Sequence, residues 1–218
     1  MVNTRLTSTI VALLTIMLCA AACFAADEPK PTPQNTISVT VEPVKPQTFA
    51  KPMKFFVDKV IDRSGDPQPM LIYKPRGGVF LDREPVAIVR EALESSLKNA
   101  DMLATDKTSA NCVLDVYVFH FGLGSGSGME FFGKVDLNVI VKEPGAAKSQ
   151  TVTAMGTSIQ GTAIRKKNIL KNIEENVEGA LQDALRNFLR GAKLRDAIAT
   201  LSATVPATPA PAAEQAVP

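Results

Sequence analysis

The chain has 218 residues, and its 24 Lys and Arg against 22 Asp and Glu give a formal net charge of +2. This near balance argues against a nucleic-acid-binding protein, which needs an excess of cations to neutralise phosphates. Hydrophobic residues make up 45% of the chain, as in ordinary globular proteins. With both ends set aside for the reasons below, about 150 residues are left, enough for one domain with a proper core.

The N-terminus has the layout of a secretory signal. Arg5 supplies one positive charge, residues 10–22 are almost wholly apolar, and small residues stand immediately before Cys23. A transmembrane span needs about 20 apolar residues, whereas this run is shorter and is followed at once by acidic residues and prolines. The sequence therefore predicts a signal peptide at residues 1–22 and an exported protein.

Cys23 is the predicted lipid-attachment residue. Three alanines precede it; the nearer two fit the pattern Leu-(Ala/Ser)-(Gly/Ala)-Cys, and the third replaces the usual Leu. Cleavage before Cys23 would give a lipoprotein, and because Phe24 rather than Asp follows, we expect it on the periplasmic side of the outer membrane. Stable anchoring takes more than one acyl chain. The alternative is ordinary cleavage after Ala22 or Ala25, which would release a soluble periplasmic protein.

Two segments have compositions that do not favour folding. Residues 23–36 contain prolines at 29, 31 and 33, which forbid a helix and favour extended polyproline structure. The C-terminal segment is rich in Ala and Pro, almost uncharged, and poor in large apolar side chains. We expect a Pro-rich tether at 23–36, a single α+β domain at 37–198 and a disordered Ala/Pro-rich tail at 199–218.

Hydrophobic periodicity predicts the elements of the domain. Strands are expected at 37–41, 54–61, 111–121, 135–142 and 150–160, a short strand at 79–81 within a long irregular connection, and helices at 85–99 and about 165–190. Pro85 suits the first position of a helix, and Gly191 suits the end of the last one. The last three strands would form an antiparallel meander. Two helices on one face of a mostly antiparallel sheet give an α+β, two-layer sandwich.

This order of elements, with several local stretches, resembles the YajG-type family of small bacterial envelope lipoproteins. The stretches are the strand end at 60–63, the helix at 89–97, the strand at 112–118 and the helix end at 181–185. A weaker resemblance is to LptE, the plug subunit of the lipopolysaccharide translocon. The resemblance implies a non-enzymatic accessory lipoprotein.

The candidate catalytic and metal-ligating residues do not form a recognised constellation. His120 is the only histidine, and although Asp115 or Asp136 could orient it, no Gly-x-Ser-x-Gly nucleophile motif accompanies it. Cys112 and Asp115 would point to opposite faces of one strand, which breaks a zinc site with His120. Cys112 itself is predicted to be buried and inert. We therefore predict no catalytic residue, no cofactor and no metal.

The stretch 122–128 has four glycines in seven residues, like a phosphate-binding loop. Such a loop needs a helix directly after it, and here a strand is predicted, so a flexible hairpin tip is favoured. The large apolar residues beside the tip, Met129, Phe131 and Phe132, are candidate partner contacts. Alternatively, they are the first inward-facing residues of the next strand.

Positive charge gathers at residues 165–167 and Lys171, at the start of the last predicted helix. This is the end where the helix dipole disfavours cations. The cluster could meet an anionic partner such as a lipid A phosphate, although a solvated surface is the favoured interpretation.

These patterns together predict a non-enzymatic exported lipoprotein that acts as an accessory or binding module of the envelope. The lipid on Cys23 would hold it at the membrane, its partner would be an envelope protein or a glycolipid, and nucleic acid is not expected. The first alternative is a soluble periplasmic binding domain with the same fold. A hydrolytic enzyme that uses His120 is the less favoured alternative.

Overall fold

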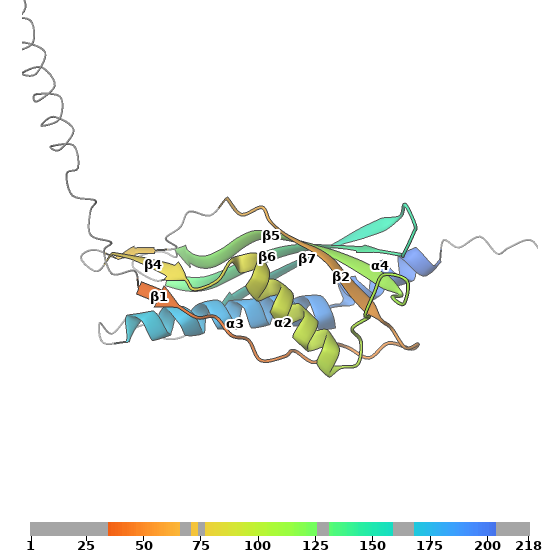
Figure 1. Cartoon of the computed structure of the whole chain (residues 1–218), viewed down its shortest axis with the longest axis horizontal. Coiled ribbons are helices and arrows are strands. Elements are labelled where there is room, and N and C mark those ends of the chain that lie inside the picture. The colour runs from red at the N-terminus through yellow and green to blue at the C-terminus, as the bar shows by residue number, and fades with distance from the viewer. Residues whose placement is uncertain (1–34, 66–70, 74–76, 126–130, 159–167, 204–218) are drawn as a thin grey trace, which may run out of the picture. The chain divides into compact units, whose positions relative to one another are not determined.

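A four-stranded sheet forms one layer of the domain (Figure 1). In spatial order it contains β2 (Phe55–Asp62), β5 (Cys112–Ser125), β6 (Phe131–Lys142) and β7 (Ser149–Ser158). The computed structural model describes residues 35–65, 71–73, 77–125, 131–158 and 168–203. The predicted signal peptide, Cys23, Met129 and residues 165–167 lie outside the described residues, as do most of the predicted tether and tail.

The predicted antiparallel meander is confirmed, and the sheet as a whole is mixed. β5, β6 and β7 pair antiparallel in sequence, whereas β2 pairs with β5 in parallel. A parallel pair needs a crossover connection, and here the crossover contains α2 (Pro85–Asn99). The α+β two-layer class is therefore confirmed, with one parallel pair in the main sheet.

A second, smaller sheet forms from β1 (Asn35–Ile37), β4 (Gly77–Leu81) and β3 (Leu71–Tyr73), in the order β1-β4-β3. The short strand expected at 79–81 is part of β4. The strand expected at 37–41 is wrong, because β1 ends at Ile37. Beyond it, the N–H groups of Ser38 and Thr40 donate to carboxylates of the last long helix, at 3.4 and 2.9 Å, instead of to a neighbouring strand.

The helices α2 and α3 (Ile169–Arg190) lie on one face of the main sheet (Figure 1). The apolar stripe predicted for α3 is buried, with Val177 and Leu181 at 0% exposure. Gly191 ends α3, and α4 (Ala192–Ser202) begins directly after it. The sequence analysis did not predict α4, and the expected start of the tail at residue 199 falls inside this helix, where Leu201 is buried.

Two glycines let α3 approach the sheet closely. A Cβ atom on Gly133 would stand 1.8 Å from the Asn176 carbonyl oxygen, and one on Gly156 would stand 2.0 Å from the Ala180 carbonyl oxygen. Real Cβ atoms do not come this close to backbone. The helix backbone therefore rests on the strands themselves at β6 and β7, and any side chain at either glycine would force the two layers apart.

Residues 38–53, which we call the strap, run in extended form along the helices (Figure 1). The Val44 N–H donates to the Ser96 hydroxyl of α2 at 2.9 Å, and the Gln47 N–H donates to the Leu189 carbonyl of α3 at 3.0 Å. Ser96 is fully buried and donates in turn to the Ala92 carbonyl. The strap thus ties the two helices together.

Replacing Gly156 by Ala should lower the free energy of unfolding by about 1–3 kcal/mol or more, because the added methyl group collides with the α3 backbone. The measurement is urea denaturation. Thr153→Ala is the control: Thr153 is exposed on the same strand, and its replacement should change stability by less than about 1 kcal/mol. Equal stability of both variants would contradict the close packing of α3.

Replacing Glu178 by Gln should stabilise the protein at neutral pH. Burial raises the pKa of the Glu178 carboxyl above its usual value, and the charges of Glu174 and Glu175 raise it further, against the opposing hydrogen bond from the Thr40 N–H. A group with a raised folded-state pKa contributes stability below its unfolded pKa and loses it as the pH rises through the folded pKa. The ionised group is therefore unfavourable at pH 7, and Gln keeps an acceptor for Thr40.

The difference between Glu178→Gln and the parent protein should shrink towards zero as the pH falls below the unfolded pKa of about 4.5. Chemical denaturation at acid and neutral pH measures it. A stability difference of the same size at both pH values would show that charge at residue 178 is not its cause.

Candidate functional site

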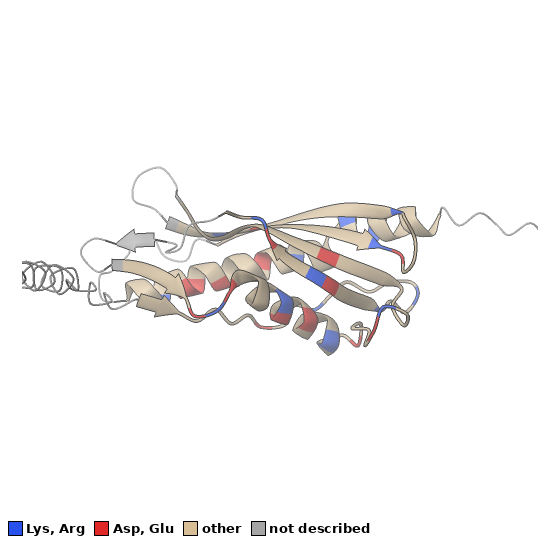
Figure 2. Cartoon of the chain, turned by 45° about the horizontal axis from the view of Figure 1, so that its top comes forward, with Lys and Arg blue, Asp and Glu red and all other residues tan. Residues whose placement is uncertain are grey.

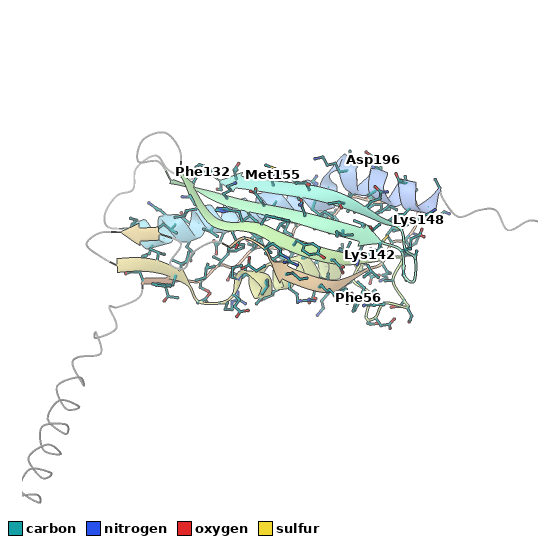
Figure 3. All side chains as sticks on the ribbon, turned by 90° about the horizontal axis from the view of Figure 1, so that it is seen from above. Phe56, Phe132, Lys142, Lys148, Met155 and Asp196 are labelled. Carbon is teal, nitrogen blue, oxygen red and sulfur yellow. The ribbon has the colours of Figure 1, made fainter. Side chains whose placement is uncertain are left out.

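The face of the main sheet opposite α2 and α3, which we call the open face, is the candidate site, and Figure 3 looks down on it. Strand alternation decides which residues lie there. On β5, Cys112, Leu114 and Val116 belong to the helix-side core, so the residues between them point the other way. The register across the sheet then places these residues on the open face: Phe56, Val113, Tyr117, Phe132, Ile140, Thr151, Thr153 and Met155.

Four charges on the open face are paired within it, whereas Lys59, exposed opposite Asp115 in the β2–β5 register, forms no ion pair with a described residue. Asp115 is 3% exposed and forms an ion pair with Lys142 of the adjacent strand. Nearer the other end, Lys134 pairs with Asp136 at 2.9 Å. In Figure 2, blue and red segments accordingly lie next to each other on strands that are mostly tan. In Asp115 and in Asp136, the Oδ1 atom is buried without a hydrogen-bond partner in the described structure. The negative charge of each carboxylate is therefore compensated by its paired lysine.

Two large apolar side chains are exposed at the level of the middle of β6. Met155 is 56% exposed, and Phe119, the extra residue of a bulge in β5, is 47% exposed. The Phe132 ring lies over Gly124, because a Cβ atom on that glycine would be 2.5 Å from the ring. Phe132 and Met155 lie in the same half of the open face in Figure 3. The Lys134–Asp136 ion pair lies between Phe132 and Met155, and exposed apolar surface bordered by polar groups is typical of interaction sites.

The structure places part of the predicted contact set. Gly133 faces α3, so its neighbour Phe132 points away from the helices and is not an inward-facing core residue. Phe131 begins β6, but its side chain is not described, and Met129 lies outside the described residues. A partner contact at these three residues stays a prediction. Lys171, which belongs to the predicted basic cluster, is exposed, and its ammonium nitrogen lies 3.6 Å from a Glu175 carboxylate oxygen.

His120 lies opposite Asp136 in the β5–β6 register, and Asp136 is the acid paired with Lys134. Cys112 is buried on the helix side, as predicted, and burial raises the pKa of its thiol to about 11, with a smaller effect from the charge of Glu143. Cys112 and Asp115 therefore lie on opposite faces of β5. Among the described residues, no group of three or more His, Cys, Asp or Glu is placed to hold a metal ion.

Side chains of α3 cover part of the outer edge of β7. The Asn187 amide donates to the Met155 carbonyl at 2.7 Å, and the Thr157 N–H donates to an Asp183 carboxylate oxygen at 3.4 Å. Edge strands with free backbone groups invite strand addition by another chain. These contacts occupy the edge beside Met155, so a partner there would meet side chains of the open face instead of adding a strand.

Sequence reasoning missed Met155 as a surface residue. Met155 lies among the alternating residues of β7, whose buried positions are Val152, Ala154 and Gly156. These three small or apolar residues recur with period two, and the positions that alternate with them hold Thr151, Thr153 and Thr157; this was the signal that could have placed Met155 outside.

No protein-family model matches the sequence, and no curated protein matches it significantly in sequence. The fold is similar to that of a DUF330-family protein from Xanthomonas campestris, with a TM-score of 0.52 at 11% identity over 74% of this chain and 99% of that chain. At this identity the likeness shows a shared fold alone.

Solved structures with lower scores include lipoproteins. A minor lipoprotein from Acinetobacter baumannii has a TM-score of 0.35 at 12% identity over 66% of this chain and 95% of its own. A protein from Chlamydia trachomatis has a TM-score of 0.38 at 10% identity over 70% and 95%. Similarity at these scores does not establish a shared function, and the resemblance to YajG-type and LptE-like proteins stays a prediction.

No helix among the described residues has the length and apolarity to span a bilayer.

Proposed function

We propose that this chain is a non-enzymatic envelope lipoprotein, exported and held at the outer membrane by lipid on Cys23, whose α+β domain binds a partner protein through its open face. The signal layout and the residues before Cys23 support the anchor. The order and pairing of the elements support a compact domain carried on that anchor.

One observation carries the binding role: Met155 is exposed on a sheet face that α2 and α3 leave uncovered, in the same half of that face as Phe132. Methionine and aromatic residues are enriched at protein interfaces, and Met adapts to irregular partner surfaces. A membrane surface or a polyanion would need several unpaired cations. Lys134 and Lys142 are engaged by carboxylates of the same face, and the exposed Lys59 adds a single charge. The chemistry therefore favours a protein partner over a glycolipid.

An enzyme that uses His120 is the less favoured alternative. Its acidic neighbour across the strands, Asp136, is held by Lys134, and the elbow that would present a nucleophilic serine is missing from the sequence. A soluble periplasmic binding domain differs from the favoured proposal in the anchor alone, and would use the same open face.

Protein purified from membranes of a bacterial host should begin at Cys23 and carry the added mass of a diacylglyceryl group and an acyl chain, because more than one chain is needed for stable anchoring. Intact-mass spectrometry measures this. The Cys23→Ala variant should lose the added mass and leave the membrane fraction. An unmodified chain in the soluble fraction of the parent protein would support the soluble periplasmic alternative instead.

A photo-crosslinking amino acid at position 155 should capture one discrete envelope protein in living cells, because Met155 is exposed at the centre of the proposed contact. The matched control is the same amino acid at Lys171, an exposed position on α3, where no crosslink to that protein is expected. The captured protein should also be lost when Phe132 is replaced by Ser, while thermal stability falls little, as for most surface changes.

Equal crosslinking at both positions would contradict a specific contact at the open face. A product of twice the chain mass would identify a second copy as the occupant, and a lipid adduct would identify a membrane contact; either would replace the proposed protein partner.

A further inference from the structure

A hollow of about 580 Å³ lies between the strap and the C-terminal end of α2, the helix that packs on the side of the sheet away from the open face. This volume is within the usual range for small-molecule sites. Its walls combine apolar side chains with lysines. Those used below are Val44, Lys45, Phe49, Lys51, Met53 and Met102.

The apolar wall of the hollow is continuous with the core of the domain. Val44 is buried, and Phe49, Met53 and Met102 are partly buried residues packed against the core. The Phe49 ring lies 6.0 Å from the Phe55 ring of β2, measured between centroids. An alkyl chain placed here would therefore leave water for a surface made of aliphatic, thioether and aromatic groups.

Lysines line the same hollow. Lys54 is engaged, because its ammonium group lies 2.8 Å from the Asp101 carboxylate and 2.7 Å from the Asp101 carbonyl oxygen. Lys45 and Lys51 are exposed and form no ion pair with any residue that the structure describes. The hollow thus has an excess of positive charge beside an apolar wall, which complements a ligand with an anionic head and an apolar tail.

The strap wall can adjust without breaking a hydrogen-bonded ladder. It is fixed at Gln47 by the Leu189 carbonyl and at Lys54 by the Asn111 side chain, at 3.0 and 2.7 Å. Between these anchors, residues 48–53 make no backbone hydrogen bond within the described structure. Segments with few such bonds open locally at low free-energy cost.

We propose that the hollow binds a single-chain anionic amphiphile, a fatty-acid anion, with its carboxylate at Lys45 and Lys51 and its chain against Phe49 and Met53. An inorganic anion would leave the apolar wall bare, and a neutral alkane would not use the lysines. This binding goes beyond the proposed function and uses the side of the domain away from the open face. Loss of ligand binding and loss of the partner crosslink are therefore separate results.

Isothermal titration of the full chain with decanoate, below the concentration at which it forms micelles, tests the proposal. Dodecanoate should bind about tenfold more tightly than decanoate, since each buried methylene contributes about fourfold in affinity and part of the chain stays in water. Acetate should not bind measurably. The double variant Lys45→Gln, Lys51→Gln should bind decanoate about tenfold more weakly and bind 1-decanol with unchanged affinity.

The matched control is the double variant Lys148→Gln, Lys171→Gln, which removes the same charge from exposed positions that do not line the hollow and should bind decanoate like the parent. Met53→Ser should weaken the binding of both decanoate and 1-decanol, and thermal melting should confirm that the variant is folded. Binding of decanoate no tighter than that of acetate, or equal loss in the two lysine double variants, would overturn the proposal. Binding to anionic vesicles without binding of monomeric decanoate would also overturn it.

Discussion

The contact between the backbone of α3 and the strands at Gly133 and Gly156 is the constraint on which the rest of the structure depends. With carbonyl oxygens of the helix closer to these glycines than any Cβ would allow, the helix cannot slide or roll without losing the contact. Its apolar stripe, with Val177 and Leu181, is thereby fixed against the sheet. The opposite side of α3 is fixed as well, and it presents Glu174 and Glu178 to the strap.

The strap is a consequence of that fixed helix. Residues 38–53 have no neighbouring strand to pair with, so their amides bond to groups supplied by the helices: carboxylates of α3, the buried Ser96 hydroxyl of α2 and the Leu189 carbonyl. Prolines at 43, 46 and 52 reduce the number of N–H groups that need a partner. A segment satisfied at a few anchors can leave space between them, and the hollow lies in that space.

Packing both α2 and α3 on one face leaves the domain asymmetric. The helix side is closed by backbone contact and by the strap, whereas the open face pairs most of its own charges, Asp115 with Lys142 and Asp136 with Lys134. The same helix also protects the β7 edge through Asp183 and Asn187. This side therefore offers a partner an exposed Met155, a half-buried Phe132 and charges that are mostly paired, and not a free edge beside Met155 or a cationic stripe.

The sequence by itself determined the α+β class, the meander of β5, β6 and β7, and the two amphipathic helices, because period-two and helical patterns are local and α3 repeats its stripe over 22 residues. It also indicated the burial of Cys112. Only the tertiary structure decided that residues 38–41 leave the sheet, since their hydrogen-bond partners stand more than 130 positions away in the chain. Likewise, the local sequence pattern makes Gly133 and Gly156 unfavourable strand positions. Their role depends on α3, which is distant in sequence and packs its backbone against them. The hollow and the open face arise in the same way: each is defined by which surfaces the helices cover, and a pattern of neighbouring residues does not contain that choice.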